Sequence, residues 1–386
     1  MTEPTLVNDV RRHRERLGLS QQELADLVGV SRQAVVGIEG GRQVPATTLS
    51  LRLAQALRCG VHDLFRLSTG TGLTARLAQP VSATSGAATA GTGAGGSAGI
   101  AAGARVAVGE VDGSWVAHGL PADGTVTADA IVTATVSERT ALLEPLTDPG
   151  LLRGNVLVTG CAPILGMLAQ RVGSRFADAR ATWIPTGSTR SLELLESKLI
   201  HVAGVHLSGA GAGEDHAPLI RELFPGEPML IVNLTRWREG FVVPAGNPMG
   251  IRGGEDLLRP GLRFARREEG AGAHRLVAGL LSSAGASGAE LAGPEAAGHA
   301  EVAQLVRSGA ADVGVAIEGV ALASGLDFVA LTEERFDLVL PASLARTGPV
   351  SRLIETLDDP AFRAEMAHVP GYDTDLSGQV TTLEAA

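Results

Sequence analysis

Two adjacent side chains near the start of the chain, Arg32 and Gln33, have the chemistry to recognise the edges of bases. An arginine guanidinium can donate two hydrogen bonds to guanine, and a glutamine amide can pair with adenine through two bonds. Both residues follow Ser31, a residue type that caps helices, so they fall in the first turn of a predicted helix. Gln21 and Arg42 lie where phosphate contacts are expected. This spacing predicts a surface that contacts the major groove of duplex DNA.

Two short helices joined by a tight turn must position these side chains, and residues 19–42 have that pattern. Ser20 and Glu23 form the S-x-x-E signature of a capped helix start. Gly29 ends this helix, and Ser31 caps the second one. The apolar residues of the two helices are Leu24, Leu27, Val28, Val35 and Ile38. The pattern is typical of a helix-turn-helix, although a helical hairpin with a polar outer face is the alternative, because S-x-x-E occurs in many helices.

Further stretches of the first 65 residues extend this pattern. The stretch R-x-x-R-x-R-L-G-L-S-Q-Q-E-L-A begins at Arg11, S-R-Q-A-V begins at Ser31, and I-E-x-G-R begins at Ile38. In these stretches residues 8–65 resemble the XRE family of phage-repressor or Cro-like DNA-binding domains. The resemblance implies five helices and sequence-specific operator binding. We expect the DNA contacts to come from Ser20, Gln21, Gln22, Ser31, Arg32, Gln33, Val36 and Arg42.

The composition sets bounds on the whole chain. With 386 residues, of which 45% are hydrophobic, it is long enough for two or three domains. No signal peptide and no apolar run of about 20 residues is visible, so we expect a cytoplasmic protein without a membrane partner. Cys59 and Cys161 are the only cysteines, which argues against a disulfide framework.

The net charge of −10 is unevenly distributed. Residues 1–67 hold nine arginines and seven acidic residues, so positive charge is concentrated where DNA is expected to bind. Four of these arginines are expected to face either the phosphate backbone or solvent: Arg11, Arg12, Arg14 and Arg16.

Residues 68–103 are rich in Gly, Ala, Ser and Thr and poor in large apolar groups. Such a segment cannot offset the entropy lost on ordering, so we predict a flexible linker. Residues 104–154 alternate apolar and polar groups on either side of Asp112 and Gly113, which indicates a β-hairpin. We predict a small β-rich segment there, which is either a separate module or an edge of the following domain.

From residue 155 to residue 386 the pattern changes to repeated strand, turn and helix. Such repeats predict a parallel sheet covered by helices, with ligands bound at the carboxyl ends of its strands. Residues 229–243 form a long extended stretch that can cross between two lobes. The stretches V-T-G-C-A-P from Val158, W-I-P-x-G-S from Trp183, F-V-V-P-x-G-N-P-x-G-I from Phe241 and G-A-G-A-H-R-L from Gly270 resemble the periplasmic-binding-protein superfamily of the molybdate-binding type. The resemblance implies a bilobed α/β domain that closes on a small molecule.

Three glycine-containing turns at predicted helix starts form the expected ligand site. Unpaired backbone N–H groups and the helix dipole favour an anion at such positions. The expected ligand residues are Gly160, Cys161, Ala162, Ser188, Thr189, Arg190, Gly270, Ala271, Gly272 and His274. They suit an oxyanion such as molybdate or tungstate, or a metabolite that bears a phosphate or carboxylate. Each turn taken alone can also be a purely structural connection.

This part of the chain departs from the family pattern at two places. Related domains commonly carry G-S-G-T-R where this chain has G-A-G-A-H at residues 270–274, and an aspartate where it has Ala162. Two hydroxyls, a guanidinium and a carboxylate are therefore missing. A less polar or larger ligand is the alternative to an oxyanion.

No catalytic or metal-binding pattern is evident. Cys161 and His206 could act as nucleophile and base, but no third orienting group has a recognisable motif. His201, His206 and His216 lack the spacing of zinc ligands. The acidic pair at residues 333–334 is interpreted as a solvated surface. We therefore expect no bound metal, no cofactor and no enzymatic activity.

Together these patterns predict a ligand-responsive transcription regulator with a five-helix DNA-binding domain and a bilobed ligand-binding domain. We expect it to bind operator DNA as a homodimer, since one such domain makes too few contacts for tight specific binding. Closure of the bilobed domain on a small effector would change the spacing of the two DNA-binding domains. The alternatives are a ligand-free bilobed domain that only dimerises and an enzyme that acts through this domain.

Overall fold

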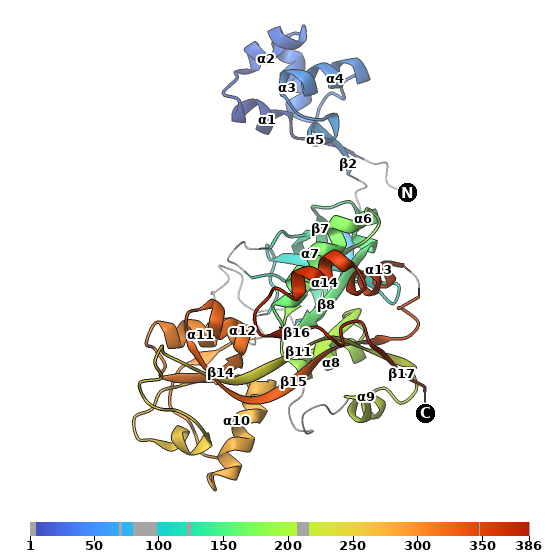
Figure 1. Cartoon of the computed structure of the whole chain (residues 1–386). Coiled ribbons are helices and arrows are strands. Elements are labelled where there is room, and N and C mark those ends of the chain that lie inside the picture. Colours follow the sequence, from blue (N-terminus) through green and yellow to red (C-terminus); the bar gives the residue numbers. More distant parts are fainter. Residues whose placement is uncertain are drawn as a thin grey trace. The chain divides into compact units, whose positions relative to one another are not determined.

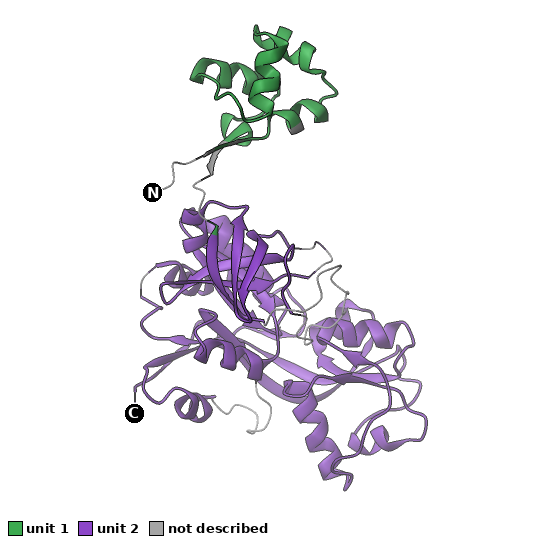
Figure 2. Cartoon of the chain, turned by 180° about the vertical axis from the view of Figure 1, so that it is seen from behind, with its two compact units in different colours: residues 1–72 green, residues 73–386 purple. Residues whose placement is uncertain are grey.

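The computed structural model describes residues 5–68, 72–79, 99–121, 124, 126–206, 216–346 and 348–385. The chain forms two compact units, Met1–Gly72 and Leu73–Ala386, which are green and purple in Figure 2. The predicted linker at residues 68–103 is wrong for Leu73–Leu77, because these residues form a strand of the second unit. Residues 80–98, which include most of its Gly- and Ala-rich part, lie outside the described residues.

The first unit contains the five helices that the resemblance implies. They are α1 (Val10–Arg16), α2 (Gln21–Val28), α3 (Arg32–Glu39), α4 (Thr47–Ala56) and α5 (Val61–Leu64). An antiparallel pair of strands, β1 (Thr5–Asn8) and β2 (Phe65–Ser68), is an addition to the predicted all-α unit. The buried core consists of Val10, Leu24, Ala25, Val28, Val35, Ile38, Leu53, Ala54, Leu57 and Leu64. Leu27, which was expected on the apolar face of α2, is exposed instead.

Local capping explains where α2 and α3 begin and end. Ser20 Oγ accepts a hydrogen bond from the Glu23 N–H at 3.2 Å, and the Ser20 N–H donates to Glu23 Oε2 at 2.7 Å. Gly29 ends α2 with a φ of 70°, which glycine adopts without strain. Ser31 Oγ accepts from the Ala34 N–H at 3.2 Å and starts α3. The predicted helix-turn-helix is confirmed.

Five strands of the second unit close into a barrel in the order β3-β5-β4-β6-β7. They are β3 (Leu73–Leu77), β4 (Arg105–Val111), β5 (Ser114–Gly119), β6 (Ala130–Ser137) and β7 (Thr140–Pro145). Asp112 and Gly113 have φ values of 49° and 71°, as the type I′ turn of the predicted hairpin requires. This region is therefore a module with its own core.

The helix α6 (Pro149–Arg153) leads from the barrel into a ten-stranded sheet that two lobes share. Its strand order is β13-β12-β14-β11-β15-β10-β8-β9, and β16 and β17 pair with β11. The first lobe contains β8 (Asn155–Gly160), α7 (Ile164–Arg175), β9 (Arg180–Pro185), α8 (Ser188–Glu196), β10 (Val202–Val205), α9 (Ala217–Leu223), α13 (Gly348–Leu357), α14 (Pro360–Met366), β16 (Tyr372–Asp373) and β17 (Val380–Leu383). The second lobe contains the 3-10 helix η1 (Gly254–Leu258), β12 (Phe264–Arg267), α10 (Gly272–Ser283), β13 (Glu295–Ala296), α11 (His299–Arg307), β14 (Val313–Ile317) and α12 (Glu318–Ala323).

Two long antiparallel strands, β11 (Met229–Val243) and β15 (Asp327–Pro341), run from one lobe to the other (Figure 1). Their pairing shifts register between Asn233 and Thr235 and again between Glu239 and Gly240, and such irregularities bend strands. At Gly240 an added Cβ would overlap the Val329 backbone, so only glycine fits this close approach.

Both lobes contain the predicted parallel strands of the βα arrangement. The pairs β8–β9 and β8–β10 are parallel in the first lobe, and β12–β13 and β12–β14 are parallel in the second. Separate buried cores lie in the two lobes. The predicted fold class, a helical N-terminal unit followed by a bilobed α/β domain, is confirmed. Among the described helices, none combines the length and apolar character needed to cross a membrane.

Candidate functional site

The start of α3 carries the candidate DNA-contacting surface. Arg32 and Gln33 are exposed in its first turn, and Val36 is half-buried one turn later. Arg42, which follows the helix, is also exposed. Ser31 uses its side-chain oxygen to cap α3, so it orients the exposed residues that follow it.

Gln21 and Gln22 make contacts within the first unit. Gln21 Nε2 donates to Glu39 Oε2 at 3.0 Å, and Gln22 Nε2 donates to Asp26 Oδ1 at 2.9 Å. Arg14 Nε also donates to Glu39, at 2.6 Å from Oε1, and both of these side chains are buried. The expectation that Arg14 faces phosphate or solvent is therefore wrong, because it holds α1 against α3.

In the second unit, turns predicted to bind a ligand meet where the two lobes touch. Thr189, at the start of α8 in the first lobe, donates its hydroxyl to the Gly270 carbonyl of the second lobe at 3.1 Å. Arg275 Nη2 donates to Thr189 Oγ1 at 3.0 Å. Ser188 is buried, and its Oγ lies 2.8 Å from the carbonyl oxygen and 3.0 Å from the amide nitrogen of His206. The cleft between the lobes is therefore closed.

Five polar side chains form a cluster in this cleft, which we call the cleft cluster: Cys161, His206, Glu239, His299 and Glu334. Cys161 lies in the loop after β8, and His206 directly follows β10. Glu239 lies on β11, His299 begins α11, and Glu334 lies on β15. His206 Nδ1 donates to Glu334 Oε2 at 2.7 Å and lies 3.8 Å from Glu239 Oε2. Donor atoms of Cys161, His206 and His299 all lie within 4.8 Å of one another, as do those of His206, Glu239 and Glu334.

Burial and mutual charge determine the protonation of the cleft cluster. Burial and the neighbouring Glu334 carboxylate raise the pKa of Glu239 to about 8. Burial and nearby positive charge lower the pKa of His299 well below its usual value. Burial also opposes a charge on His206, but Cys161 and the two carboxylates raise its pKa well above the usual value. At neutral pH His206 is therefore the cationic partner of Glu334, whereas His299 is neutral.

Both ring nitrogens of His299 are buried and make no hydrogen bond within the part of the chain that the structure describes. The rings of Trp237 and Phe336 lie beside His206, with centroids 5.2 Å and 6.2 Å from it. A buried polar group without a hydrogen bond costs about 1–3 kcal/mol. A species that bonds to these atoms would therefore be held strongly.

Comparison with known proteins shows what both units are similar to. A helix-turn-helix model matches residues 10–64, and a PBP superfamily domain model matches residues 169–358. An HTH-type transcriptional regulator of Methanothermobacter thermautotrophicus is 48% identical over 59 residues, which are 15% of this chain and 86% of that protein. The chain belongs to the HTH-type transcriptional regulators.

The PBP-like domain of the regulator has similar proteins of its own. The YvgK protein of Bacillus subtilis is 29% identical over 231 residues, which are 59% of the regulator and 74% of YvgK. The solved structure of the sulfate-binding protein SubI from Mycobacterium tuberculosis has a TM-score of 0.41 at 18% identity, and the match covers 58% of the regulator and 88% of SubI. The ABC-type phosphate transport receptor from Vibrio cholerae has a TM-score of 0.39 at 13% identity, over 57% of the regulator and 99% of the receptor.

Three predicted ligand residues of the regulator point away from the cleft cluster. Arg190 Nη1 pairs with Glu193 Oε2 at 2.8 Å, and its Nη2 donates to the Ala78 carbonyl at 3.2 Å, so the guanidinium faces the barrel. His274 is exposed. Ala162 is fully buried in the apolar core of the first lobe. These placements argue against the predicted ligand roles of Arg190 and His274.

At three other predicted ligand positions of the regulator, the backbone and not a side chain has the structural role. Gly160 has a φ of 148°, and its carbonyl accepts from Trp183 Nε1 at 2.9 Å. Ala271 is buried and forms the N-cap of α10. An added Cβ on Gly272 would overlap the His206 ring. Gly272 therefore allows the second lobe to approach the cleft cluster.

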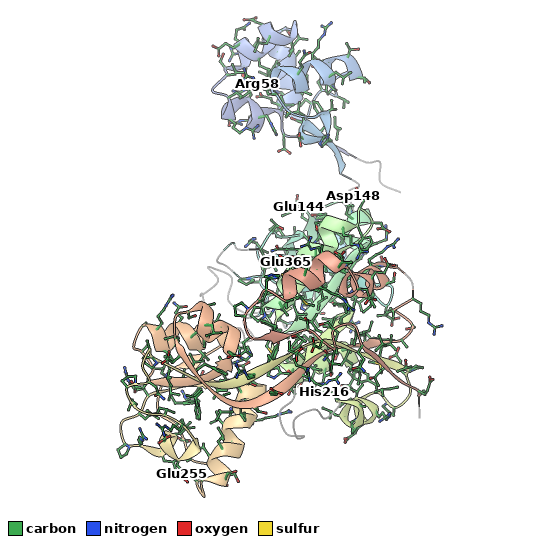
Figure 3. The ribbon with its side chains drawn as sticks, in the orientation of Figure 1. Arg58, Glu144, Asp148, His216, Glu255 and Glu365 are labelled. Atoms are coloured by element: carbon green, nitrogen blue, oxygen red, sulfur yellow. The ribbon has the colours of Figure 1, made fainter. Side chains whose placement is uncertain are left out.

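The three histidines that lack zinc spacing have separate contacts. His201 bonds to the barrel, with Nε2 3.0 Å from the Glu110 carbonyl. His216, labelled in Figure 3, lies at the start of α9 with Nδ1 2.9 Å from Asp337 Oδ2. Of the three, His206 alone belongs to the cleft cluster.

Sequence reasoning missed three members of the cleft cluster. The interpretation of residues 333–334 as a solvated pair is wrong for Glu334, which is buried and supplies the orienting group that the sequence does not show for His206. Glu239 is a carboxylate inside the largely apolar strand β11, and that signal could have identified it. His299 follows a glycine at a helix start, and nothing in the sequence distinguishes it.

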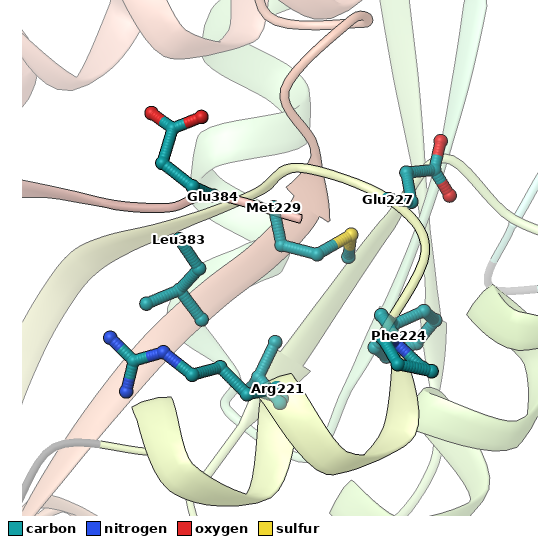
Figure 4. A pocket seen from close by; sticks show the side chains of 8 residues that line it. Arg221, Phe224, Glu227, Met229, Leu383 and Glu384 are labelled. Atoms are coloured by element: carbon teal, nitrogen blue, oxygen red, sulfur yellow. The ribbon is translucent and has the colours of Figure 1, made fainter. Parts of the chain in front are cut away.

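A separate small pocket lies between α9 and the start of β11. Figure 4 shows the apolar side chains of Phe224, Met229 and Leu383 with charged groups around them, and Arg221 and Glu227 are among these. None of the predicted ligand residues and no member of the cleft cluster lines it. The pocket therefore adds nothing to the candidate site.

Proposed function

We propose that the regulator binds operator DNA through α3 and that closure of its bilobed domain on a small effector changes its operator affinity. The closed cleft carries the proposal. Thr189 bonds to Gly270 across the lobes, and the ring nitrogens of the buried His299 have no hydrogen bonds within the described residues. A species that bridges these groups binds the closed form better than the open one, and this difference in affinity is what shifts the equilibrium.

The DNA-binding part of the proposal assigns separate roles to exposed residues of the first unit. Arg32 and Gln33 contact base edges in the major groove, and Arg42 contacts phosphate. A homodimer on an inverted repeat supplies enough contacts for specific binding. The regulator then acts in the cytoplasm, where its operator is.

The class of effector depends on the charge and size of the cleft. Helix starts favour an anion, which supports an oxyanion such as molybdate or a metabolite with a phosphate or carboxylate. The hydroxyls of Ser188 and Thr189 already bond within the protein. The Glu334 carboxylate would repel an anion in the closed cleft. An anionic effector therefore needs a wider cleft than the closed form has.

An operator-binding titration tests the proposal. A duplex selected from random sequences with the full-length regulator serves as the operator, and fluorescence anisotropy reports its Kd. Each effector class is then added separately: molybdate, tungstate, phosphate, sulfate and divalent metal ions. We expect one class to change the Kd at least tenfold and to raise the unfolding temperature of the second unit. If none does, the bilobed domain acts only in dimerisation.

The geometry also favours a second candidate function, hydrolysis through a cysteine nucleophile. Cys161, His206 and Glu334 have the order of nucleophile, base and orienting group. Our main proposal is binding without turnover, because His299 and Glu239 have no part in such a triad. Incubation with an activated ester separates the two functions. A stoichiometric burst of product that disappears in Cys161→Ser would establish hydrolysis, and no burst is expected.

A further inference from the structure

We infer that the closed cleft of the regulator binds a divalent transition-metal ion such as Zn²⁺ through Cys161, His206 and His299. The inference rests on the proposed function, since it names the effector class of the same cleft. One thiolate and two imidazoles form a donor set that suits zinc, cobalt and nickel. Magnesium and calcium prefer oxygen ligands alone.

The donor atoms are close to the separation that a metal ion requires. Those of Cys161, His206 and His299 all lie within 4.8 Å of one another, and so do those of His206, Glu239 and Glu334. Around a tetrahedral zinc ion, neighbouring donor atoms are about 3.3–3.6 Å apart. Cys161, His206 and His299 each have to move inward by roughly 1 Å or less. His299 can move without breaking a hydrogen bond, because its ring nitrogens make none to the described residues.

The surroundings of His206 match those of a metal-bound histidine. Its Nδ1 donates to Glu334 Oε2 at 2.7 Å, which orients the ring, and Nε2 becomes a ligand when the metal ion displaces its proton. Metal-binding histidines usually donate their second nitrogen to a carboxylate in this way. Trp237 and Phe336 lie against the same ring and provide an apolar wall. Glu334 is therefore assigned as the positioning residue of the site.

The size of the cleft cluster favours a single ion over an oxyanion. Groups that hydrogen-bond an oxyanion lie about 2.8 Å from its oxygen atoms, so donors on opposite sides are roughly 7 Å or more apart. The donor atoms of the cleft cluster lie within 4.8 Å of one another in each set of three.

The same ligands connect the two lobes. Cys161 and His206 belong to the first lobe, and His299 begins α11 of the second lobe. An ion held by all three ligands is bound by the closed form and not by an open one. Metal binding therefore stabilises closure, which is the step that the proposed function couples to operator binding.

Cobalt(II) titration of the full-length regulator, purified with a chelator and then freed of it, tests the inference. We expect one equivalent of Co²⁺ to produce a thiolate-to-metal charge-transfer band and the visible bands of a tetrahedral site, and Zn²⁺ to displace them. Cys161→Ser should abolish the charge-transfer band, and His299→Ala should weaken binding at least 100-fold. Glu334→Gln should weaken binding by about 10-fold to 100-fold. Cys59→Ser and His274→Ala are the matched controls, because these residues lie outside the cleft cluster, and both should bind Co²⁺ like the wild type.

A second measurement covers variants that fail to fold. In the wild-type regulator, Zn²⁺ should slow alkylation of Cys161 by iodoacetamide at least tenfold, as read by peptide mass spectrometry, and leave Cys59 unchanged. The inference is overturned by the absence of a charge-transfer band, by a band that survives Cys161→Ser, or by alkylation of Cys161 that Zn²⁺ does not slow.

Operator binding distinguishes failure of the metal site from failure of the proposed function. A Cys161-dependent band together with a Zn²⁺-dependent change in operator Kd supports both. A Cys161-dependent band with no effect of any effector on the Kd keeps the metal site and refutes the proposed function. No band, with an oxyanion that changes the Kd, refutes the metal site and keeps the proposed function.

Discussion

Protonation of two buried histidines should destabilise the second unit at acid pH. His201 Nδ1 accepts from the Leu157 N–H at 3.0 Å, and its Nε2 lies 3.0 Å from the Glu110 carbonyl of the barrel. His118 Nε2 lies 2.8 Å from the Leu199 carbonyl of the first lobe. Both rings bond as neutral imidazoles. A proton on His201 Nδ1 would point at the Leu157 N–H and remove that bond.

The magnitude follows from the pKa values of the two rings. Burial lowers the pKa of His118 and of His201 to about 4, compared with about 6.5 in an unfolded chain. The unfolded chain takes up these protons first, so the stabilisation is complete above pH of about 6.5 and is lost as the pH falls toward 4. Between pH 7.5 and pH 5, each histidine lowers the free energy of unfolding by about 2 kcal/mol. For a unit of this size the pair lowers the Tm by about 6 °C.

Tryptophan fluorescence during thermal unfolding measures this effect. All three tryptophans of the chain lie in the second unit, so the signal reports on that unit alone. The drop in Tm from pH 7.5 to pH 5 should be about 6 °C smaller in the double variant His118→Gln with His201→Gln than in the wild type. His368→Gln, a change at an exposed histidine, should leave the drop unchanged. An equal drop in the double variant and the wild type would refute the assignment of neutral, hydrogen-bonded rings.

Three further substitutions test the first unit and the closed cleft. Arg32→Ala should weaken binding to a selected operator by about 10-fold to 100-fold and leave binding to random DNA nearly unchanged. Arg42→Ala should weaken binding to both kinds of DNA alike. Fluorescence-anisotropy titrations measure the Kd for each kind of DNA. Arg14→Ala leaves the buried Glu39 without its cationic partner and should destabilise the first unit by about 3 kcal/mol, which appears as roughly 100-fold faster amide hydrogen exchange in α3. Gly272→Ala should destabilise the second unit by about 1–3 kcal/mol, because its Cβ would overlap the His206 ring; fluorescence-detected unfolding measures the loss.

Matched variants control these substitutions. Arg11→Ala removes an exposed pair with Glu15 and should change stability by less than about 0.5 kcal/mol. Gly279→Ala, in the same helix as Gly272, meets open space and should be neutral or slightly stabilising. Equal effects of Arg32→Ala and Arg42→Ala on the two kinds of DNA would contradict their assigned roles. Exchange in α3 as fast in Arg11→Ala as in Arg14→Ala would contradict the structural role of Arg14.

The first unit shows how far local patterns extend. The caps at Ser20 and Ser31 and the turn at Gly29 act within four residues along the chain, so the sequence alone is sufficient to place α2 and α3. The pairing of Arg14 with Glu39 joins residues 25 positions apart. The sequence around Arg14 does not indicate that its helix face is covered or that its partner is Glu39. The expectation that Arg14 contacts phosphate was wrong for that reason.

The barrel shows the limit of composition as a guide. Residues 68–103 read as one uniform linker because small residues dominate them, yet Leu73–Leu77 form strand β3. A short strand is stabilised by its neighbours β5 and β7, and those contacts are not visible in five residues of sequence.

The chain's local patterns were enough to define a capped helix-turn-helix, repeated βα units and glycine turns at helix starts, because hydrogen bonds and hydrophobic periodicity operate over a few neighbouring residues. Tertiary structure alone decided that Cys161 and His206 meet Glu239, His299 and Glu334. The two connecting strands and the closed lobes bring these residues together from distant parts of the chain. Burial then changes what they can do, since a carboxylate and an imidazole removed from water must bind a partner that the sequence does not name.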